Sequence, residues 1–409
     1  MGTRMPTKIQ NQWLLVVGII FIASTLRAPL TSVGPVIHQI KSDLLINDMI
    51  AGLITTIPLV IFGVVSIGVT RIIKRFDMSF ILLIAVIATI CGLLVRVAGG
   101  VSTFFVGTFM LGVSIAFCNV TLPAFAKSHF PLQIGLITGI YSATMNLTAG
   151  LGGGFSYPLS QFSALDYRLS LSFWLVFALL AIVCWLPQVK HKSVNHARAL
   201  PPTKTYNIVK SKLAWAVAIL MAFQSMTFYC IVAWYPSILI SKGISPEMAG
   251  YMLMLNQFAQ LPMTFSFPIL AAKMRSQRRL IYIITTLFVL GFMMLWAQNV
   301  WLLLLAMIFS GMAVGACFSL CMTLFSIRAK TTTGSMQLSG FGQTVGYLIA
   351  AIGPFLMGAI YEWTNEWPIA IALFLVMSLM ILIAGHFATT TAVIEDECIK
   401  NSARDRNRF

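Results

Sequence analysis

Twelve separate stretches of the chain are apolar for long enough to cross a lipid bilayer, which takes about 20 residues of α-helix. They lie at residues 13–38, 49–72, 79–98, 103–126, 133–158, 169–187, 213–240, 247–271, 280–298, 301–326, 335–361 and 367–388. Charged residues make up only 9% of the chain, too few to cover a soluble surface of this size. The sequence therefore predicts an all-α membrane protein with twelve transmembrane helices, and it excludes a soluble enzyme or a disordered chain.

One polar connection divides these stretches into two sets of six. Residues 188–211 are rich in Lys and Arg and contain the helix-stopping pair Pro201 and Pro202. We therefore predict an N-terminal six-helix bundle over 1–187, a cytoplasmic linker over 188–211, a C-terminal six-helix bundle over 212–388 and a cytoplasmic tail over 389–409.

Lys and Arg gather on one side of the predicted spans. With the N-terminus in the cytoplasm, the outer loops hold Lys41, Arg168 and Lys242, while Arg27 and Arg96 lie within spans. All the others of the 27 Lys and Arg residues fall on the inner side. Because cytoplasmic loops are enriched in these residues, both termini are predicted to be cytoplasmic. The same asymmetry explains the net charge of +16 without a nucleic-acid partner.

The two halves repeat each other at an offset of about 201 residues. This offset carries Pro35 to Pro236 and Gly139 to Gly340, and MLGVSIAFC at 110–118 matches FSGMAVGAC at 309–317 at a similar offset. Several matches in consistent order indicate a duplication. Two parallel six-helix pseudo-repeats resemble the architecture of the major facilitator superfamily.

Acidic and histidine residues avoid the predicted spans. The acidic residues are Asp43, Asp48, Asp77, Asp166, Glu247, Glu362, Glu366, Glu395, Asp396, Glu397 and Asp405. All of them, and all five His, lie in loops, at span ends or in the tail. Intramembrane carboxylates and imidazoles are the usual parts of a proton relay. The sequence therefore argues against tight coupling to the proton gradient, without excluding it.

Arg27 is the main candidate for a charged group in a substrate cavity. It lies about fourteen residues into the first span, ~21 Å along a helix, and is therefore near the bilayer midplane. A central Arg costs roughly 2.5 to 3.5 kcal/mol. Either an anionic or electron-rich substrate interacts with it, or it bonds to carbonyls freed by Pro29 and Pro35. Arg96, near the outer end of the third span, is expected to reach the interface.

Several amides and phenols lie in the middle of spans and are candidates for lining the transport path. Together with Arg27, the predicted substrate-binding residues are Asn119, Tyr141, Asn146, Tyr229, Asn256, Gln257, Gln260, Gln343 and Tyr347. Each could instead be a hydrogen-bonding contact between helices. No nucleotide-binding, metal-ligand or catalytic motif is found, so we expect no cofactor, no metal and no enzyme activity.

Six segments resemble the cyanate/nitroimidazole transporter (CynX/NimT) branch of the major facilitator superfamily. They are TLRAPLTSVGP (25–35), GLITTIPL (52–59), CNVTLPAFAKSHFP (118–131), TGIYSATMN (138–146), WYPSILISKGIS (234–245) and LSGFGQTVGYLIAAIGPFLMG (338–358). The resemblance runs over essentially the whole chain. It implies a bacterial inner-membrane carrier of small polar or anionic compounds, some associated with cyanate or nitroimidazole-type substrates.

The chain departs from the wider superfamily at two places. Ile72 stands where an acid is expected four residues after Gly68, which weakens the usual gating salt-bridge network. GlyLeuGlyGlyGly in the fifth span replaces the Gly-Pro pair of drug/proton antiporters.

The sequence favours a monomeric secondary transporter that moves a small polar solute across the bilayer by alternating access. A drug or antibiotic efflux carrier is the alternative within transport, and a non-transporting membrane receptor is the alternative from another class.

Overall fold

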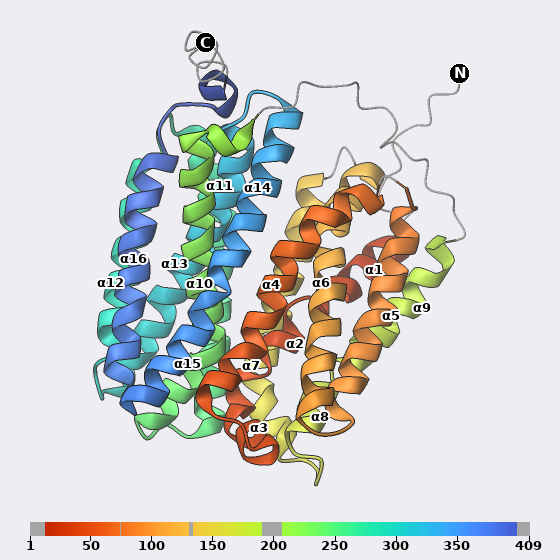
Figure 1. Ribbon diagram of the computed structural model, residues 1–409, viewed down its shortest axis with the longest axis vertical. Coiled ribbons are helices and arrows are strands. Elements are labelled where there is room, and N and C mark those ends of the chain that lie inside the picture. The colour runs from red at the N-terminus through yellow and green to blue at the C-terminus, as the bar shows by residue number, and fades with distance from the viewer. Residues whose placement is uncertain (1–12, 74, 131–133, 190–206, 399–409) are drawn as a thin grey trace, which may run out of the picture. The chain divides into compact units, whose positions relative to one another are not determined.

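The computed structural model describes residues 13–73, 75–130, 134–189 and 207–398. Within these ranges every regular element is helical. The elements are α1 (Trp13–Ser24), α2 (Ala28–Thr31), η2 (Gly34–Val36), α3 (Ile37–Leu44), α4 (Asp48–Ile73), α5 (Met78–Val97), α6 (Val101–His129), α7 (Ile134–Ser160), α8 (Tyr167–Ser172), α9 (Leu175–Val189), η4 (Ile208–Lys210), α10 (Lys212–Ser241), α11 (Pro246–Lys273), α12 (Arg278–Met294), α13 (Val300–Ile327), α14 (Thr332–Ala350), α15 (Ile352–Thr364) and α16 (Trp367–Ala388) (Figure 1).

The twelve predicted spans are confirmed as helical, and three of them are interrupted. The first span is divided into α1, α2, η2 and α3, the sixth into α8 and α9, and the eleventh into α14 and α15. Nine helical segments of the described residues are long and apolar enough to cross a membrane. The other three spans correspond to α7, α11 and α12.

The described residues form two compact units. Unit 1 takes residues 13–46, 64–189 and 244–254, and unit 2 takes residues 47–63, 207–243 and 255–398. Both α4 and α11 therefore contribute to each unit. Residues 190–206 of the predicted linker and 399–409 of the predicted tail lie outside the described residues.

In unit 1, small residues bring α5 and α6 into close contact. A Cβ atom added at Gly92 would lie 3.1 Å from the main-chain oxygen of Gly107, and one added at Gly107 would overlap Arg96. Thr89 on α5 also donates a hydrogen bond to Ser114 on α6 at 3.0 Å. Close backbone approach and hydroxyl bonds are how helices associate in lipid, where apolar burial alone gives no advantage.

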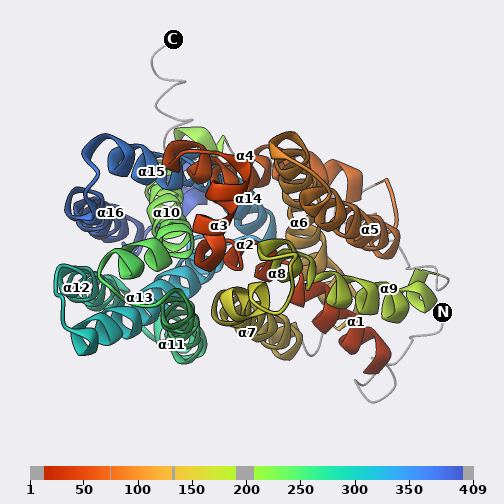
Figure 2. The same cartoon turned by 90° about the horizontal axis from the view of Figure 1, so that it is seen from below.

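In unit 2, α10 is the central helix. It packs against α13, α14, α15 and α16 (Figures 1 and 2). In the most apolar 18-residue stretch of α10, 89% of the residues are buried inside the protein. A second tight contact joins α11 to α13, because Gly311 and Gly315 lie directly against the main chain of Asn256 and Gln260.

Candidate substrate-binding site

The first span breaks at the residues that carry the candidate charge. Residues 25–27 form a turn between α1 and α2, and Arg27 is the residue that precedes α2. Pro29 has no N–H to bond to residue 25, and its ring disfavours a continuous helix. The backbone tightens accordingly, with Thr25 N bonding to Ile22 O at 3.0 Å and Leu26 N to Ala23 O at 3.2 Å.

Side chains from two other helices donate hydrogen bonds to main-chain carbonyls of the interrupted first span. Arg96 Nη1 on α5 donates to the main-chain oxygen of Pro29 at 2.8 Å. Ser156 on α7 donates to the main-chain oxygen of Ser32 and also shares a hydrogen bond with Ser170 at 2.7 Å. Unsatisfied carbonyls are costly in hydrocarbon, so a broken span requires such partners.

Gly152 lets α7 lie directly against the break. A Cβ atom added there would stand 2.6 Å from Thr31 Oγ1 and 3.0 Å from Ala28 O. This position belongs to the GlyLeuGlyGlyGly run of the fifth span. The small residues therefore fix α7 beside Arg27.

That packing brings Arg27 and Asn146 together, two of the residues predicted from the sequence. Arg27 Nη1 donates to Asn146 Oδ1 at 2.5 Å. Asn146 is 5% exposed, and Arg27 is half-buried. The guanidinium is thus held by a neutral amide that cannot cancel its charge.

The expectation that Arg96 reaches the interface is wrong. Arg96 is 1% exposed, and its guanidinium carbon lies 4.9 Å from the centre of the Phe104 ring. The Pro29 carbonyl and the aromatic face give the cation partners inside unit 1. Sequence reasoning missed this role, because the missing N–H of Pro29 affects the carbonyl of residue 25 and gives no sign that the Pro29 carbonyl itself needs a donor. Nothing in the sequence pointed to Ser156.

Asn119 and Tyr141 also belong to unit 1. Asn119 lies on α6 and Tyr141 on α7, five residues before Asn146, and both are half-buried.

The other predicted substrate-binding residues belong to unit 2. Those on α11 form hydrogen bonds either to a neighbouring helix or within α11 itself. Asn256 donates both amide hydrogens to α13, to Met307 O and Ser310 Oγ, each at 2.9 Å. This is the interhelical role that the sequence left open. Gln260 donates to Gln257 Oε1 at 2.9 Å, and these two side chains are also buried.

Tyr229, Gln343 and Tyr347 complete the set in unit 2. Tyr229 on α10 is 8% exposed and packs edge-on against Phe228. On α14, Gln343 donates to Ser339 Oγ at 2.9 Å, and Tyr347 packs edge-on against Phe62.

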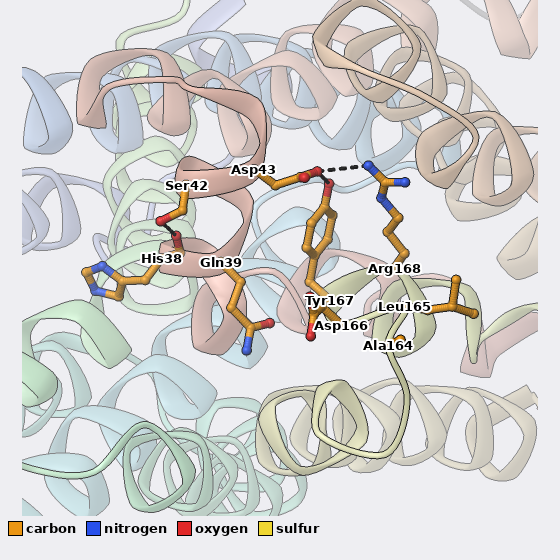
Figure 3. A pocket seen from close by; sticks show the side chains of 9 residues that line it. All are labelled: His38, Gln39, Ser42, Asp43, Ala164, Leu165, Asp166, Tyr167 and Arg168. Carbon is orange, nitrogen blue, oxygen red and sulfur yellow. Dashed lines mark hydrogen bonds and ion pairs between the residues drawn. The ribbon is translucent and has the colours of Figure 1, made fainter.

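A separate pocket of about 660 Å³ lies at the end of unit 1 and contains none of the predicted residues. It is bounded by residues 38–43 and 164–168 (Figure 3). Asp43 accepts hydrogen bonds from Tyr167 OH at 2.7 Å and from Arg168 Nη2 at 2.9 Å. The Asp43 and Arg168 side chains are 44% and 37% exposed, so this is a solvated ion pair that fastens α3 to α8.

The described carboxylates lie at helix ends, as the sequence predicts. Glu362, near the end of α15, accepts from Asn47 Nδ2 at 2.7 Å and Met49 N at 2.9 Å, and so caps the start of α4. Glu395 accepts from the main-chain nitrogens of Lys330 and Thr331. Burial opposes the charge of Glu395, but these N–H donors outweigh it and lower its pKa.

Comparison with known proteins assigns this architecture to the membrane transporters. The family model of the Major Facilitator Superfamily matches residues 14–350 and 217–400. The chain belongs to this superfamily and, within it, to the cyanate/nitroimidazole transporter (CynX/NimT) family.

Three bacterial relatives support this assignment. The chain is 36% identical to the "Uncharacterized transporter YycB" of Bacillus subtilis (strain 168), with 98% of each chain covered. It is 32% identical to the 2-nitroimidazole transporter of Escherichia coli (strain K12), over 92% of this chain and 95% of the relative. It is 24% identical to the cyanate transport protein CynX of the same strain, over 85% and 90%.

Solved structures of low sequence identity confirm the fold alone. The D-xylose–proton symporter superposes with a TM-score of 0.75 at 12% identity, covering 96% of this chain and 99% of that one. A bacterial homologue of the human lysosomal transporter Spinster, in an inward-facing and occupied conformation, gives 0.66 at 14% identity, covering 96% and 98%.

Proposed function

We propose that this transporter carries a small anionic or electron-rich organic compound of the cyanate or nitroimidazole type, and that Arg27 is its recognition group. The observation that carries the proposal is the Arg27–Asn146 hydrogen bond beside the break in the first span. Two relatives are named for transport of 2-nitroimidazole and of cyanate, which share partially or fully negative oxygen or nitrogen atoms.

The chemistry of the pair suits such a substrate. A guanidinium is planar, stays charged and presents N–H donors in a fork that matches a nitro group or a small anion. Asn146 orients this fork while leaving its positive charge in place, because an amide is neutral. In a medium of low dielectric constant that charge attracts an anion far more strongly than it would in water.

The remaining predicted residues are proposed as further substrate contacts. Asn119 and Tyr141 lie in the same unit as Arg27, and Gln343 and Tyr347 lie on α14 of unit 2. Tyr229, Gln257 and Gln260 also stay in this set. Asn256 has the weakest case, because both of its amide hydrogens bond to α13.

We propose alternating access between the repeats 1–187 and 212–388 as the mechanism, without an intramembrane carboxylate relay. The direct test is reconstitution of the purified protein in liposomes and counterflow of labelled 2-nitroimidazole and cyanate. Saturable exchange of either compound, inhibited by the other, is expected. Exchange of neither compound, alongside saturable exchange of a hydrophobic cation, would favour the drug-efflux alternative.

The proposed location is the bacterial inner membrane, with a monomeric chain and both termini in the cytoplasm. A cysteine introduced at Ser193 in the linker should resist impermeant thiol reagents in intact cells and react after permeabilisation. Labelling in intact cells would reverse the proposed orientation. The native cysteines are replaced by Ser or Ala in the protein used for both the intact and the permeabilised cells.

A further inference from the structure

A groove on unit 2 lies apart from every residue proposed for transport. It has a volume of about 750 Å³ and is formed by the first turns of α10 and the last turns of α16 with the segment that follows. Both helix ends lie at the same end of the unit (Figure 1). The groove therefore opens where these two helices leave the hydrocarbon.

The walls of the groove are apolar and the mouth is basic. Its apolar lining includes Trp215, Ile219, Ile383 and Phe387, and three of these (Trp215, Ile383 and Phe387) are between 38% and 61% exposed. From Lys212 to Ile219 is seven residues, so the wall reaches ~10 Å along α10 from the basic mouth. An apolar wall of this length can contact the upper part of a lipid acyl chain.

The mouth carries two exposed lysines, Lys210 and Lys212. The acidic residue among the lining residues is Glu397, and its Oε2 already accepts from Ser211 Oγ at 2.5 Å and from Leu213 N at 3.1 Å. The Trp215 indole donates a hydrogen bond to Val209 O at 2.9 Å. A ring that packs on apolar surface and bonds through its N–H is typical of a tryptophan at the membrane interface. The groove thus offers net positive charge above an apolar slot.

We propose that this groove binds an anionic phospholipid, with the headgroup phosphate at Lys210 and Lys212 and one acyl chain along Ile219 and Ile383. Lysines bury their stems along apolar surface and keep the ammonium at the headgroup level. Basic pockets between transmembrane helices are a recognised form of anionic-lipid site. The two charges favour a phosphatidylglycerol over a phosphatidylcholine, whose quaternary ammonium would lie near both lysines.

The test is native mass spectrometry of the purified full chain, titrated with phosphatidylglycerol or phosphatidylcholine. Each basic group near a membrane surface contributes about fivefold in affinity, so K210Q/K212Q is expected to weaken phosphatidylglycerol binding ~thirtyfold. The control is R278Q/R279Q, which removes two exposed arginines from the start of α12. That variant is expected to change the affinity less than twofold.

A second variant tests the slot without touching the charge. Ala216→Phe places a ring in the groove from the half-buried face of α10 and is expected to weaken phosphatidylglycerol binding at least tenfold, at an unchanged melting temperature. Excess glycerol phosphate, which has the headgroup without the chain, should not displace the lipid. Equal affinity for the two lipids, an equal loss in R278Q/R279Q, or displacement by glycerol phosphate would overturn the proposal. If A216F does not fold, brominated phosphatidylglycerol replaces it, with W215F to identify the Trp215 fluorescence. Trp215 lines the slot, so the lipid should quench the parent more strongly than K210Q/K212Q, and equal quenching in the two would overturn the proposal.

Discussion

Arg96 on α5 donates a 2.8 Å hydrogen bond to the main-chain oxygen of Pro29, 67 residues away in the chain. One of the two arginines within the predicted spans thus stabilises the broken first span, while the other, Arg27, is held beside that break by Asn146. We assign Arg96 a structural role and Arg27 a role in substrate binding, so substitution of Arg96 should lower stability and substitution of Arg27 should lower ligand affinity.

Substitution of Arg96 should reduce stability more than binding. In Arg96→Met the side chain keeps its approximate volume, but the buried carbonyl of Pro29 loses its donor, which costs roughly 1–3 kcal/mol. Arg96→Lys retains a donor and should recover part of the loss. The measurement is the melting temperature of both purified variants. A melting temperature for Arg96→Met equal to that of the parent would remove Arg96 from this role.

Substitution of Asn146 should change binding according to charge. Asn146→Ala removes the acceptor that orients Arg27, and we expect about tenfold weaker binding of cyanate or a nitroimidazole, as for the loss of one hydrogen bond. Asn146→Asp places a carboxylate against the guanidinium and should bind an anion more weakly than the Ala variant does. Titration calorimetry compares them. Tighter binding of the same ligand by Asn146→Asp would contradict recognition through the positive charge of Arg27.

Neutralising single carboxylates should leave transport intact. Asp43 forms an exposed ion pair with Arg168, and Glu362 caps α4, so each has a structural task at a helix end. We expect D43N and E362Q to retain exchange activity per inserted protein. Counterflow in liposomes, corrected for protein by quantitative blotting, provides the measurement. Abolished exchange in either variant at normal insertion would mean that a proton relay uses that carboxylate.

The Glu395 carboxylate should make part of the stability depend on pH. Its pKa is lowered in the folded protein because the main-chain N–H groups of Lys330 and Thr331 outweigh the opposing effect of burial. The contribution to stability is therefore present above the unfolded pKa of about 4.3 and is lost as the pH falls through the folded value. Melting temperatures of the parent and E395Q should differ at pH 7, and the difference should shrink as the pH falls below the unfolded pKa. A constant difference across this range would contradict the assignment.

The sequence predicted the twelve helices and the Arg27 candidate because both depend on composition along single spans. Apolar stretches of this length require helices, and an arginine within such a stretch can be identified without knowing which way its side chain points. The break at residues 25–27 was harder to locate, since Pro29 indicates a disturbance without saying which donors repair it. That repair comes from Arg96 and Ser156, which lie on two other helices. Helix packing decides such partners, and hydropathy carries no information about it.

The same limit explains the amides on α11. Asn256 and Gln260 share one helical face, and the sequence left open whether that face lines a cavity or packs against another helix. Gly311 and Gly315 lie against this part of α11, so the helices approach until the Asn256 amide bonds to α13. Gly311 and Gly315 are four residues apart, a spacing that allows close helix contact, but the sequence does not say which helix packs against them.

The measurement that tests the central claim most directly is ligand affinity together with melting temperature on the same purified samples of Arg27→Ala, Arg27→Lys and the parent. We predict that Arg27→Ala loses roughly 30-fold or more in affinity for cyanate or 2-nitroimidazole, and Arg27→Lys about tenfold, since a charge-assisted hydrogen bond is worth roughly 1.5–3 kcal/mol. Both variants should melt close to the parent, because the freed carbonyls are bonded by Arg96 and Ser156. Unchanged affinity with a lowered melting temperature would contradict the account and make Arg27 a structural residue.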